Sequence, residues 1–375
     1  MSSLDQQISF FNQITRFDIV KLLIPTIVAF AAGILVTPLV TKYMFKYELW
    51  KKKSVSRSVD GRAAPLTQKL HNDEARKVPR MGGMIVVLAV LFTTIVFWIL
   101  SKAIDSQWTF ELDFLSRAQT LLPLTALVGG FIIGVIDDLA VVGKIKATQG
   151  LLGKYVGGGI PLRVRIGFVA LVGLFCGWWF FSKLGYESIY IPFSGDLQLG
   201  WLIIPLFVII MAATYSGGVI DGVDGLSGGV MAIIFTTYGL ISFMQFRFDL
   251  ATFCMVIVGG LLAFLWFNIP PARFFMSETG IMALTLALSV VAFFTDTVVL
   301  LPIIGLPLVV SSGSVIIQVI SKKLRHGKKI FLISPLHNHF QAAGWPAAKV
   351  TMRYWVISQI SATTGFIIFL LGYKL

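Results

Sequence analysis

Five acidic residues in this chain have the types and spacing that chemistry on a phosphate needs. They form two adjacent aspartates, two aspartates three positions apart and one glutamate: Asp137, Asp138, Asp221, Asp224 and Glu278. All lie at or near the ends of long apolar stretches, and ionisable groups beside the hydrocarbon of a membrane are costly, so they indicate function. Carboxylates bind Mg²⁺ through one or two residues while substrate phosphates complete the shell. The pattern therefore predicts phosphoryl transfer, which depends on positioning and charge neutralisation.

The structural alternative is that these acids only solvate helix ends. For a lone acid, this structural role and a functional role would be equally reasonable. Two pairs and a glutamate that face one basic side favour a functional site. Glycines surround the third and fourth acids, in Gly217-Gly218 and in Asp221–Gly225. Glycine allows a backbone to approach a ligand closely, although it also allows membrane helices to pack.

The composition requires that membrane helices position these acids. Of the 375 residues, 56% are hydrophobic and 13% are charged, about half of the charged fraction in soluble domains. Too little polar surface is left for a soluble globule, and disorder needs low hydrophobicity. The net charge of +13 would suggest nucleic acid in a soluble protein, but in a membrane protein it marks cytoplasmic loops, so no nucleic-acid partner is expected. Cys176 and Cys254 form neither a disulfide framework nor a metal-binding CxxC pair.

We predict an all-α integral membrane protein, with residues 1–375 forming a single polytopic domain. A spanning helix needs about 20 mostly apolar residues. Ten stretches qualify: 18–46, 83–101, 119–136, 164–182, 199–216, 226–246, 250–268, 279–295, 298–320 and 352–373.

Lysine and arginine set the predicted orientation. Of these residues, 21 fall in the loops on one side and six on the other. The positive-inside rule places both termini in the periplasm and the basic side in the cytoplasm; its loops are 47–82, 137–165, 215–225, 269–278 and 321–351. The acids then face the cytoplasm. On the outer side, alternating apolar residues in Tyr186–Gly200 predict one short β-hairpin.

Six short motifs occur in order along the chain. They are VPRMGG at 78–83, FIIGVIDD at 131–138, DGVDGL at 221–226, FLWFNIPPARFFMSETG at 264–280, SPLHNHFQAAGW at 334–345 and KVTMRYWVIS at 349–358. In this order and spacing the chain resembles the polyprenyl-phosphate N-acetylhexosamine-1-phosphate transferases, from about residue 65 onward. The last two motifs favour the phospho-N-acetylmuramoyl-pentapeptide transferases (MraY) over WecA-like relatives.

The resemblance implies a ten-helix enzyme of the bacterial inner membrane whose active site faces the cytoplasm. Its reaction transfers phospho-N-acetylmuramoyl-pentapeptide from UDP-N-acetylmuramoyl-pentapeptide to undecaprenyl phosphate, which yields lipid I and UMP. The implied cofactor is Mg²⁺, with Mn²⁺ as the alternative ion. Membrane lipid is a further partner, and the resemblance leaves a homodimer open.

The resemblance also implies roles for individual residues. The predicted catalytic residues are Asp137 and Asp138 beside the lipid phosphate, Asp221 beside the nucleotide, and His337 and His339 near the pyrophosphate. The predicted substrate-binding residues are Asp224 and Asn268 in the uracil pocket, Phe275 stacking on uracil, and Asn338, Lys77 and Lys144. Glu278 is the predicted metal ligand. Two histidines without a third ligand make an incomplete zinc site.

Several positions depart from the family pattern. Glu278 stands where the family has aspartate, and Asn338 replaces the middle histidine of three. Tyr215 and Gly218 replace asparagines, and Ala75 and Val141 replace lysines, with Lys77 and Lys144 nearby. One extra methylene at a metal ligand moves the carboxylate by about 1 Å, a misplacement that can cost about 10²-fold in rate.

Two other functions stay open. The altered residues suit a related transferase that uses another UDP-N-acetylhexosamine, or a lipid-binding or transport protein with impaired catalysis. Transporters place charges at the membrane midplane and often contain inverted repeats. Here the acids gather at one side and no repeat is visible, which ranks transport last.

Overall fold

A computed structural model describes residues 15–50, 77–116, 119–144 and 159–373. The long helices are α2 (Arg16–Lys46), α5 (Gly83–Ala103), α7 (Leu121–Val142), α8 (Leu162–Leu184), α9 (Ile203–Ser216), α10 (Leu226–Met244), α11 (Phe248–Asn268), α12 (Ser277–Phe294), α14 (Leu306–Leu324) and α16 (Ala347–Gly372). Shorter elements join them: α6 (Gln107–Leu112), η1 (Gly200–Leu202), η2 (Gly217–Ile220), η3 (Val298–Leu300), α13 (Leu301–Ile304) and α15 (Leu336–Ala342).

The described part of the chain has nine helices that are long and apolar enough to cross a membrane, and a bent pair that makes a tenth. The bent pair joins Val298–Ile304 to Leu306–Leu324 at 80°. Nine of the ten predicted spans are thus present as single helices, and the bent pair lies where the ninth was predicted. Helices satisfy their own backbone groups, which lipid cannot do, and buried threonines follow the same rule: Thr93 and Thr285 donate to carbonyls of their own helices at 2.8 Å.

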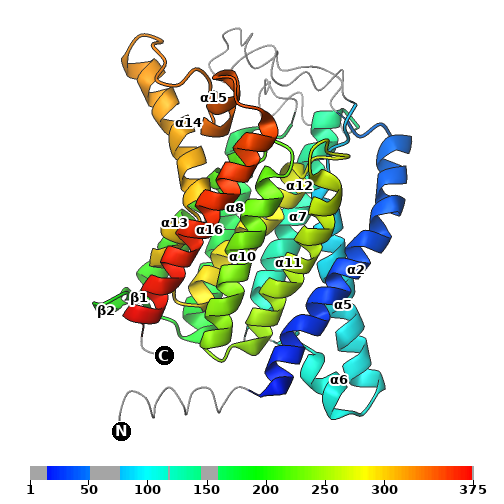
Figure 1. Ribbon diagram of the computed structural model, residues 1–375. Coiled ribbons are helices and arrows are strands. Elements are labelled where there is room, and N and C mark those ends of the chain that lie inside the picture. Colours follow the sequence, from blue (N-terminus) through cyan, green and yellow to red (C-terminus); the bar gives the residue numbers. More distant parts are fainter. Residues whose placement is uncertain (1–14, 51–76, 117–118, 145–158, 374–375) are drawn as a thin grey trace.

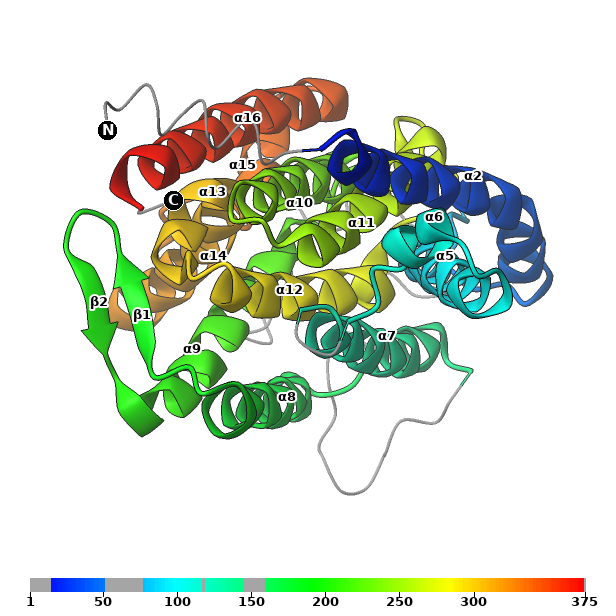
Figure 2. The same cartoon turned by 90° about the horizontal axis from the view of Figure 1, so that it is seen from below.

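The centre of the bundle is α12, with α10 and α11 on one side and α7 and α9 on the other (Figure 2). In the most apolar window of α12, 94% of residues are buried, against 17% in α2 and 33% in α16. Large apolar side chains point outward around the periphery, for example Leu35, Trp266 and Leu371. An outer surface of this kind fits a lipid environment.

Two ends of the bundle can be told apart in Figure 1. The start of α2, the end of α16 and the β-hairpin lie at the lower end, and α15 and the start of α12 lie at the upper end. The hairpin pairs β1 (Ser188–Ile191) with β2 (Gly195–Gln198) in antiparallel fashion, which confirms the hairpin predicted between Tyr186 and Gly200. The cytoplasmic position of the upper end is still a prediction from the charge bias.

Several predicted boundaries were wrong. The third span does not stop at 136, because α7 continues to Val142. The loop expected at 215–225 is helical up to Ile220, and the one expected at 321–351 contains the helix α15. Most of the first basic loop, residues 51–76, lies outside the described part of the chain, and Ala75 with it.

Candidate active site

The first turn of α12 gathers two of the predicted aspartates. The amide and hydroxyl of Thr279 donate to Oδ2 of Asp138 at 2.9 and 2.6 Å. The amide of Ser277 donates to Oδ2 of Asp221 at 2.7 Å. The first amides of a helix lack partners within it, and its positive dipole end favours anions. The two aspartates therefore cap α12 from α7 and from the segment after η2.

Close packing of α7 against α12 brings Asp137 and Asp138 to the first turn of α12. A Cβ on Gly134 of α7 would lie 2.4 Å from the carbonyl oxygen of Glu278, and one on Gly130 would lie 2.7 Å from that of Met282. Only glycine fits such contacts. The sequence predicted a loop from residue 137 onward. Because α7 continues past these glycines to Val142, Asp137 and Asp138 lie within its last turns instead.

Two arginines neutralise much of the charge. Nε of Arg80 lies 3.0 Å from Oδ1 of Asp138, whose side chain is fully buried. Nη1 of Arg165 bonds to Oε1 of Glu278 and lies 3.7 Å from Oδ2 of Asp137. Buried charges need such partners. Neither arginine was among the predicted site residues.

Glu278 is more open than the two adjacent aspartates of the acid cluster, by which we mean Asp137, Asp138, Asp221 and Glu278. Its side chain is 24% exposed, against 2% for Asp137 and 0% for Asp138. Besides Arg165 it accepts a hydrogen bond from the hydroxyl of Tyr215 at 3.2 Å. A departure from the family pattern at position 215 thus contacts the departure at position 278.

Asp221 is held from two sides. Its Oδ1 accepts from the hydroxyl of Ser227 at 2.7 Å, in addition to the amide of Ser277. Burial raises the pKa of Asp221 above its ordinary value, and these hydrogen bonds and the charge of Arg80 oppose that rise. Ser277 has a φ of 59°, in the left-handed region that residues other than glycine rarely adopt, so Asp221 bonds to a strained point of the backbone.

The predicted uracil-side residues hold two loops together. The side chain of Asn268 accepts from the amide of Gly225 at 3.0 Å and donates to the carbonyl of Phe274 at 2.7 Å. Oδ2 of Asp224 accepts from the amide of Ala272 at 3.2 Å. Phe275 is half-buried, and its backbone bonds to Pro79 and Gly82. Asp224, Asn268 and Phe275 thus belong to one loop assembly around residues 221–225 and 269–276.

The two predicted histidines take different positions. His337 is fully buried and packs on the loop of Asp221, since a Cβ on Gly222 would meet its Nε2 at 2.6 Å. Nδ1 of His339 accepts from the amide of Leu332 at 3.2 Å, within its own loop. Between them, the buried side-chain oxygen of Asn338 has no hydrogen-bond partner among the described residues. His337 thus contacts the loop that carries Asp221.

The two predicted lysines lie at the surface. Lys77 and Lys144 are both exposed, and in the described ranges neither forms an ion pair with the acid cluster. The positive charges next to the acids are Arg80 and Arg165 instead.

The donor set fits a divalent cation of the Mg²⁺ kind. No group of three or more His, Cys, Asp or Glu within the described residues could hold a metal by itself. Mg²⁺ does not need such a cage, because one or two carboxylates and the substrate's phosphates suffice. Glu278 is an oxygen donor with an open face, so it suits this mode of binding. In the arrangement described here, Arg165 is bonded to that carboxylate.

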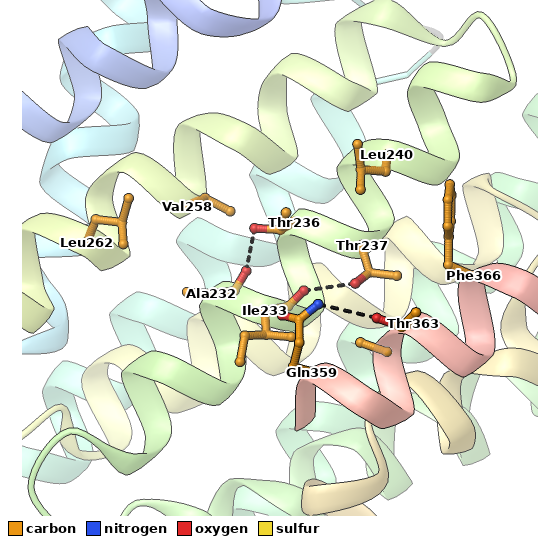
Figure 3. Close-up of a pocket in the computed structure, with 11 residues that line it drawn as sticks. Ala232, Ile233, Thr236, Thr237, Leu240, Val258, Leu262, Gln359, Thr363 and Phe366 are labelled. Carbon is orange, nitrogen blue, oxygen red and sulfur yellow. Dashed lines mark hydrogen bonds between the residues drawn. The ribbon is translucent and has the colours of Figure 1, made fainter. Parts of the chain in front are cut away.

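A separate cavity of about 330 Å³ lies between α10, α11 and α16 (Figure 3). Its wall is mainly apolar, and its polar groups include Gln359, which donates to the hydroxyl of Thr363 at 3.3 Å. None of the acid cluster lines it. The cavity is therefore distinct from the candidate active site.

A helical membrane bundle with buried, arginine-paired carboxylates at one end defines a class, the polytopic membrane proteins with an ionisable site at one end. Residues 120–296 match the family model described as glycosyl transferase family 4. A phospho-N-acetylmuramoyl-pentapeptide-transferase of Listeria innocua is 34% identical over 78% of this chain and 84% of its own length. The protein of the same name from Latilactobacillus sakei is 33% identical over 78% of this chain and 84% of its own length. The one from Chloroflexus aurantiacus is 32% identical over 76% of this chain and 76% of its own length. The chain belongs to the phospho-N-acetylmuramoyl-pentapeptide-transferase family.

Proposed function

We propose that this enzyme transfers phospho-N-acetylmuramoyl-pentapeptide from its UDP-linked donor to undecaprenyl phosphate, with lipid I and UMP as products. Family membership supports the reaction class. The observation that carries the proposal is the acid cluster at one end of the membrane bundle. A nucleotide from water and a phosphate carried by a lipid can meet only at such an end.

The proposed reaction forms one bond and breaks another. An oxygen of the lipid phosphate attacks the β-phosphorus of the donor, and the bond from that phosphorus to the bridging oxygen breaks, so UMP leaves with that oxygen. Asp137 contacts the lipid phosphate in this proposal, and the adjacent Asp138 lies beside that phosphate. Asp221 lies on the nucleotide side in this proposal, and His337 and His339 lie near the pyrophosphate. Asn338, Lys77 and Lys144 are further substrate contacts.

Charge neutralisation is the main requirement, because both substrates are anionic. Glu278 would hold a divalent cation, Mg²⁺ or Mn²⁺, which supplies positive charge against the pyrophosphate. Arg80 and Arg165 add permanent positive charge beside it. Asp224 and Asn268 would bind the uracil, with Phe275 stacking on it. The proposed enzyme works at the cytoplasmic face of the bacterial inner membrane.

A different UDP-N-acetylhexosamine donor is the second candidate. The observation that favours it is Tyr215, which stands where the family has asparagine and bonds to Glu278. A changed residue at the metal-binding acid changes the surroundings of the donor's phosphates.

The test offers purified protein, Mg²⁺ and undecaprenyl phosphate a panel of UDP-sugars and measures UMP release. We expect release with UDP-N-acetylmuramoyl-pentapeptide and little with UDP-N-acetylglucosamine. The reverse preference would establish the second candidate. A thermal unfolding measurement shows whether the purified protein is folded. If folded protein releases no UMP with any donor, the result would contradict transferase activity of this chain.

A further inference from the structure

Arg165 lies where three helices meet. It is the fourth residue of α8, and its side chain is 9% exposed. Its guanidinium bonds to Glu278 at the start of α12, and Nη1 lies 3.7 Å from Asp137 near the end of α7. One permanent positive charge therefore faces two carboxylates that come from separate helices.

This position conflicts with a cation at the same carboxylate. Guanidinium stays protonated under all physiological conditions, so its charge cannot be removed by losing a proton. A divalent cation on Glu278 would meet a carboxylate whose Oε1 is bonded to Arg165 and whose Oε2 accepts from Tyr215. It would also lie within a few ångströms of a like charge, where repulsion is strong at the effective dielectric of a protein. The cation and Arg165 cannot both bind Glu278 fully.

We propose that Arg165 competes with the divalent cation for Glu278 and is a positioning residue of the reaction. In the substrate-free protein it holds Glu278 and Asp137 in place. When the cation and the anionic pyrophosphate bind together, the guanidinium leaves Glu278, keeps its contact with Asp137 and turns to the phosphate oxygens. The pyrophosphate step rests on the proposed function, whereas the competition for Glu278 does not.

The competition makes a prediction opposite to that of structural damage. Removing a merely structural arginine would loosen the site and weaken cation binding. Removing a competitor should strengthen it. We therefore expect Arg165→Gln to bind Mn²⁺ about tenfold more tightly than wild type, as loss of a nearby like charge predicts. Arg165→Lys, which keeps the charge but not the planar fork, should fall between the two.

Arg163 offers a matched control, since it is an arginine two positions away with an exposed side chain. Arg163→Gln changes the net charge equally, and its Mn²⁺ affinity should equal that of wild type. Glu278→Gln should lose the site, and adding Arg165→Gln to it should restore nothing.

The measurement is Mn²⁺ binding to full-length protein in detergent by electron paramagnetic resonance, without any donor sugar. Unchanged or weaker binding in Arg165→Gln would overturn the proposal. Equal gains in Arg165→Gln and Arg163→Gln, or a gain that persists with Glu278→Gln, would overturn it too, because the effect would then be general charge. Since no turnover is involved, failure of the proposed transferase reaction would leave this result intact, and the two failures can be told apart.

Discussion

The two ends of the helical bundle use carboxylates for different purposes. At the end opposite the acid cluster, Oδ1 of Asp296 accepts from the amide of Tyr190 at 2.9 Å, and its carbonyl accepts from the hydroxyl of Tyr373 at 2.9 Å. One acid there fastens the hairpin, and the nearby Arg247 bonds to a backbone carbonyl.

The acid cluster holds more charge than fastening requires. Asp138 and Asp221 satisfy the first amides of α12, as Asp296 satisfies a strand amide. Asp137 and Glu278 instead share an arginine, and Glu278 keeps an open face. Helix capping explains the first two acids, and it does not explain the second two. Asp137 is buried and also accepts from the amide of Ile160 at 2.7 Å. The comparison thus separates acids that hold the fold from Glu278, which is open to a ligand.

The largest expected effect is at Glu278. Under the proposed function, Glu278→Gln should lower UMP release at least about 10²-fold, because it removes the carboxylate proposed to hold the cation beside the reacting phosphates. Its melting temperature should change little, because Arg165 keeps Asp137 as a partner. Asp196→Asn, an exposed acid on the hairpin, should keep wild-type turnover. Equal turnover in both variants would contradict the claim that acids at the two ends of the bundle serve different purposes.

A shorter acid at the same position tests how the site adapted. Glu278→Asp withdraws the carboxylate by about 1 Å, and misplacement on that scale can cost about 10²-fold. Because Arg165 and Tyr215 both bond to the longer side chain, we expect turnover to fall tenfold or more. Unchanged or higher turnover would mean that these contacts do not set the position of the acid.

The next effect separates the adjacent aspartates. Asp138→Asn leaves Arg80 without its carboxylate and weakens a cap of α12, so the free energy of unfolding should fall by roughly 3 kcal/mol. Asp137→Asn should lower turnover with a smaller loss of stability, because Arg165 keeps Glu278. Thermal unfolding in detergent and UMP release measure the two quantities. Equal stability of both variants would contradict the division of roles.

A smaller effect concerns pH at the opposite end. Burial raises the pKa of Asp296 to about 6, and the hydrogen bond from the amide of Tyr190 opposes this rise. The folded protein then binds more protons than the unfolded chain between about pH 4 and pH 6, so stability should fall as pH rises through that window and level off above it. Asp296→Asn should flatten this part of the melting-temperature profile. A rise in wild-type stability over the same window that depends on Asp296 would refute the assignment.

The last experiment measures chemical labelling of single cysteines, which reports orientation rather than activity. Cys176 and Cys254 are buried, so single cysteines at exposed positions can report the sides of the membrane. With an impermeant thiol reagent on intact cells, Asp196→Cys should be labelled and Lys144→Cys should not. Labelling of Lys144→Cys from outside would reverse the predicted orientation. His337 is unsuitable for this test because it is fully buried.

The sequence predicted the ten spans and the hairpin because lipid demands long apolar helices and strands alternate in polarity. It misplaced the end of α7, since Asp137-Asp138 looks like a helix end. The cost of burying these acids is offset by Arg80, Arg165 and the first turn of α12, which lie far away in sequence. Arg165 was counted only as a loop charge. Arg80 lies within VPRMGG, and that motif was the one signal that could have identified it.

The contact between Gly134 and the Glu278 carbonyl has a consequence for how this enzyme can diverge. It fixes the backbone at position 278, so any change in the length of the acid must be absorbed at the tip of its side chain. Arg165 and Tyr215 meet that tip. Natural variants should therefore change positions 165, 215 and 278 as a set, and a lineage that altered one alone would be selected against until the others followed.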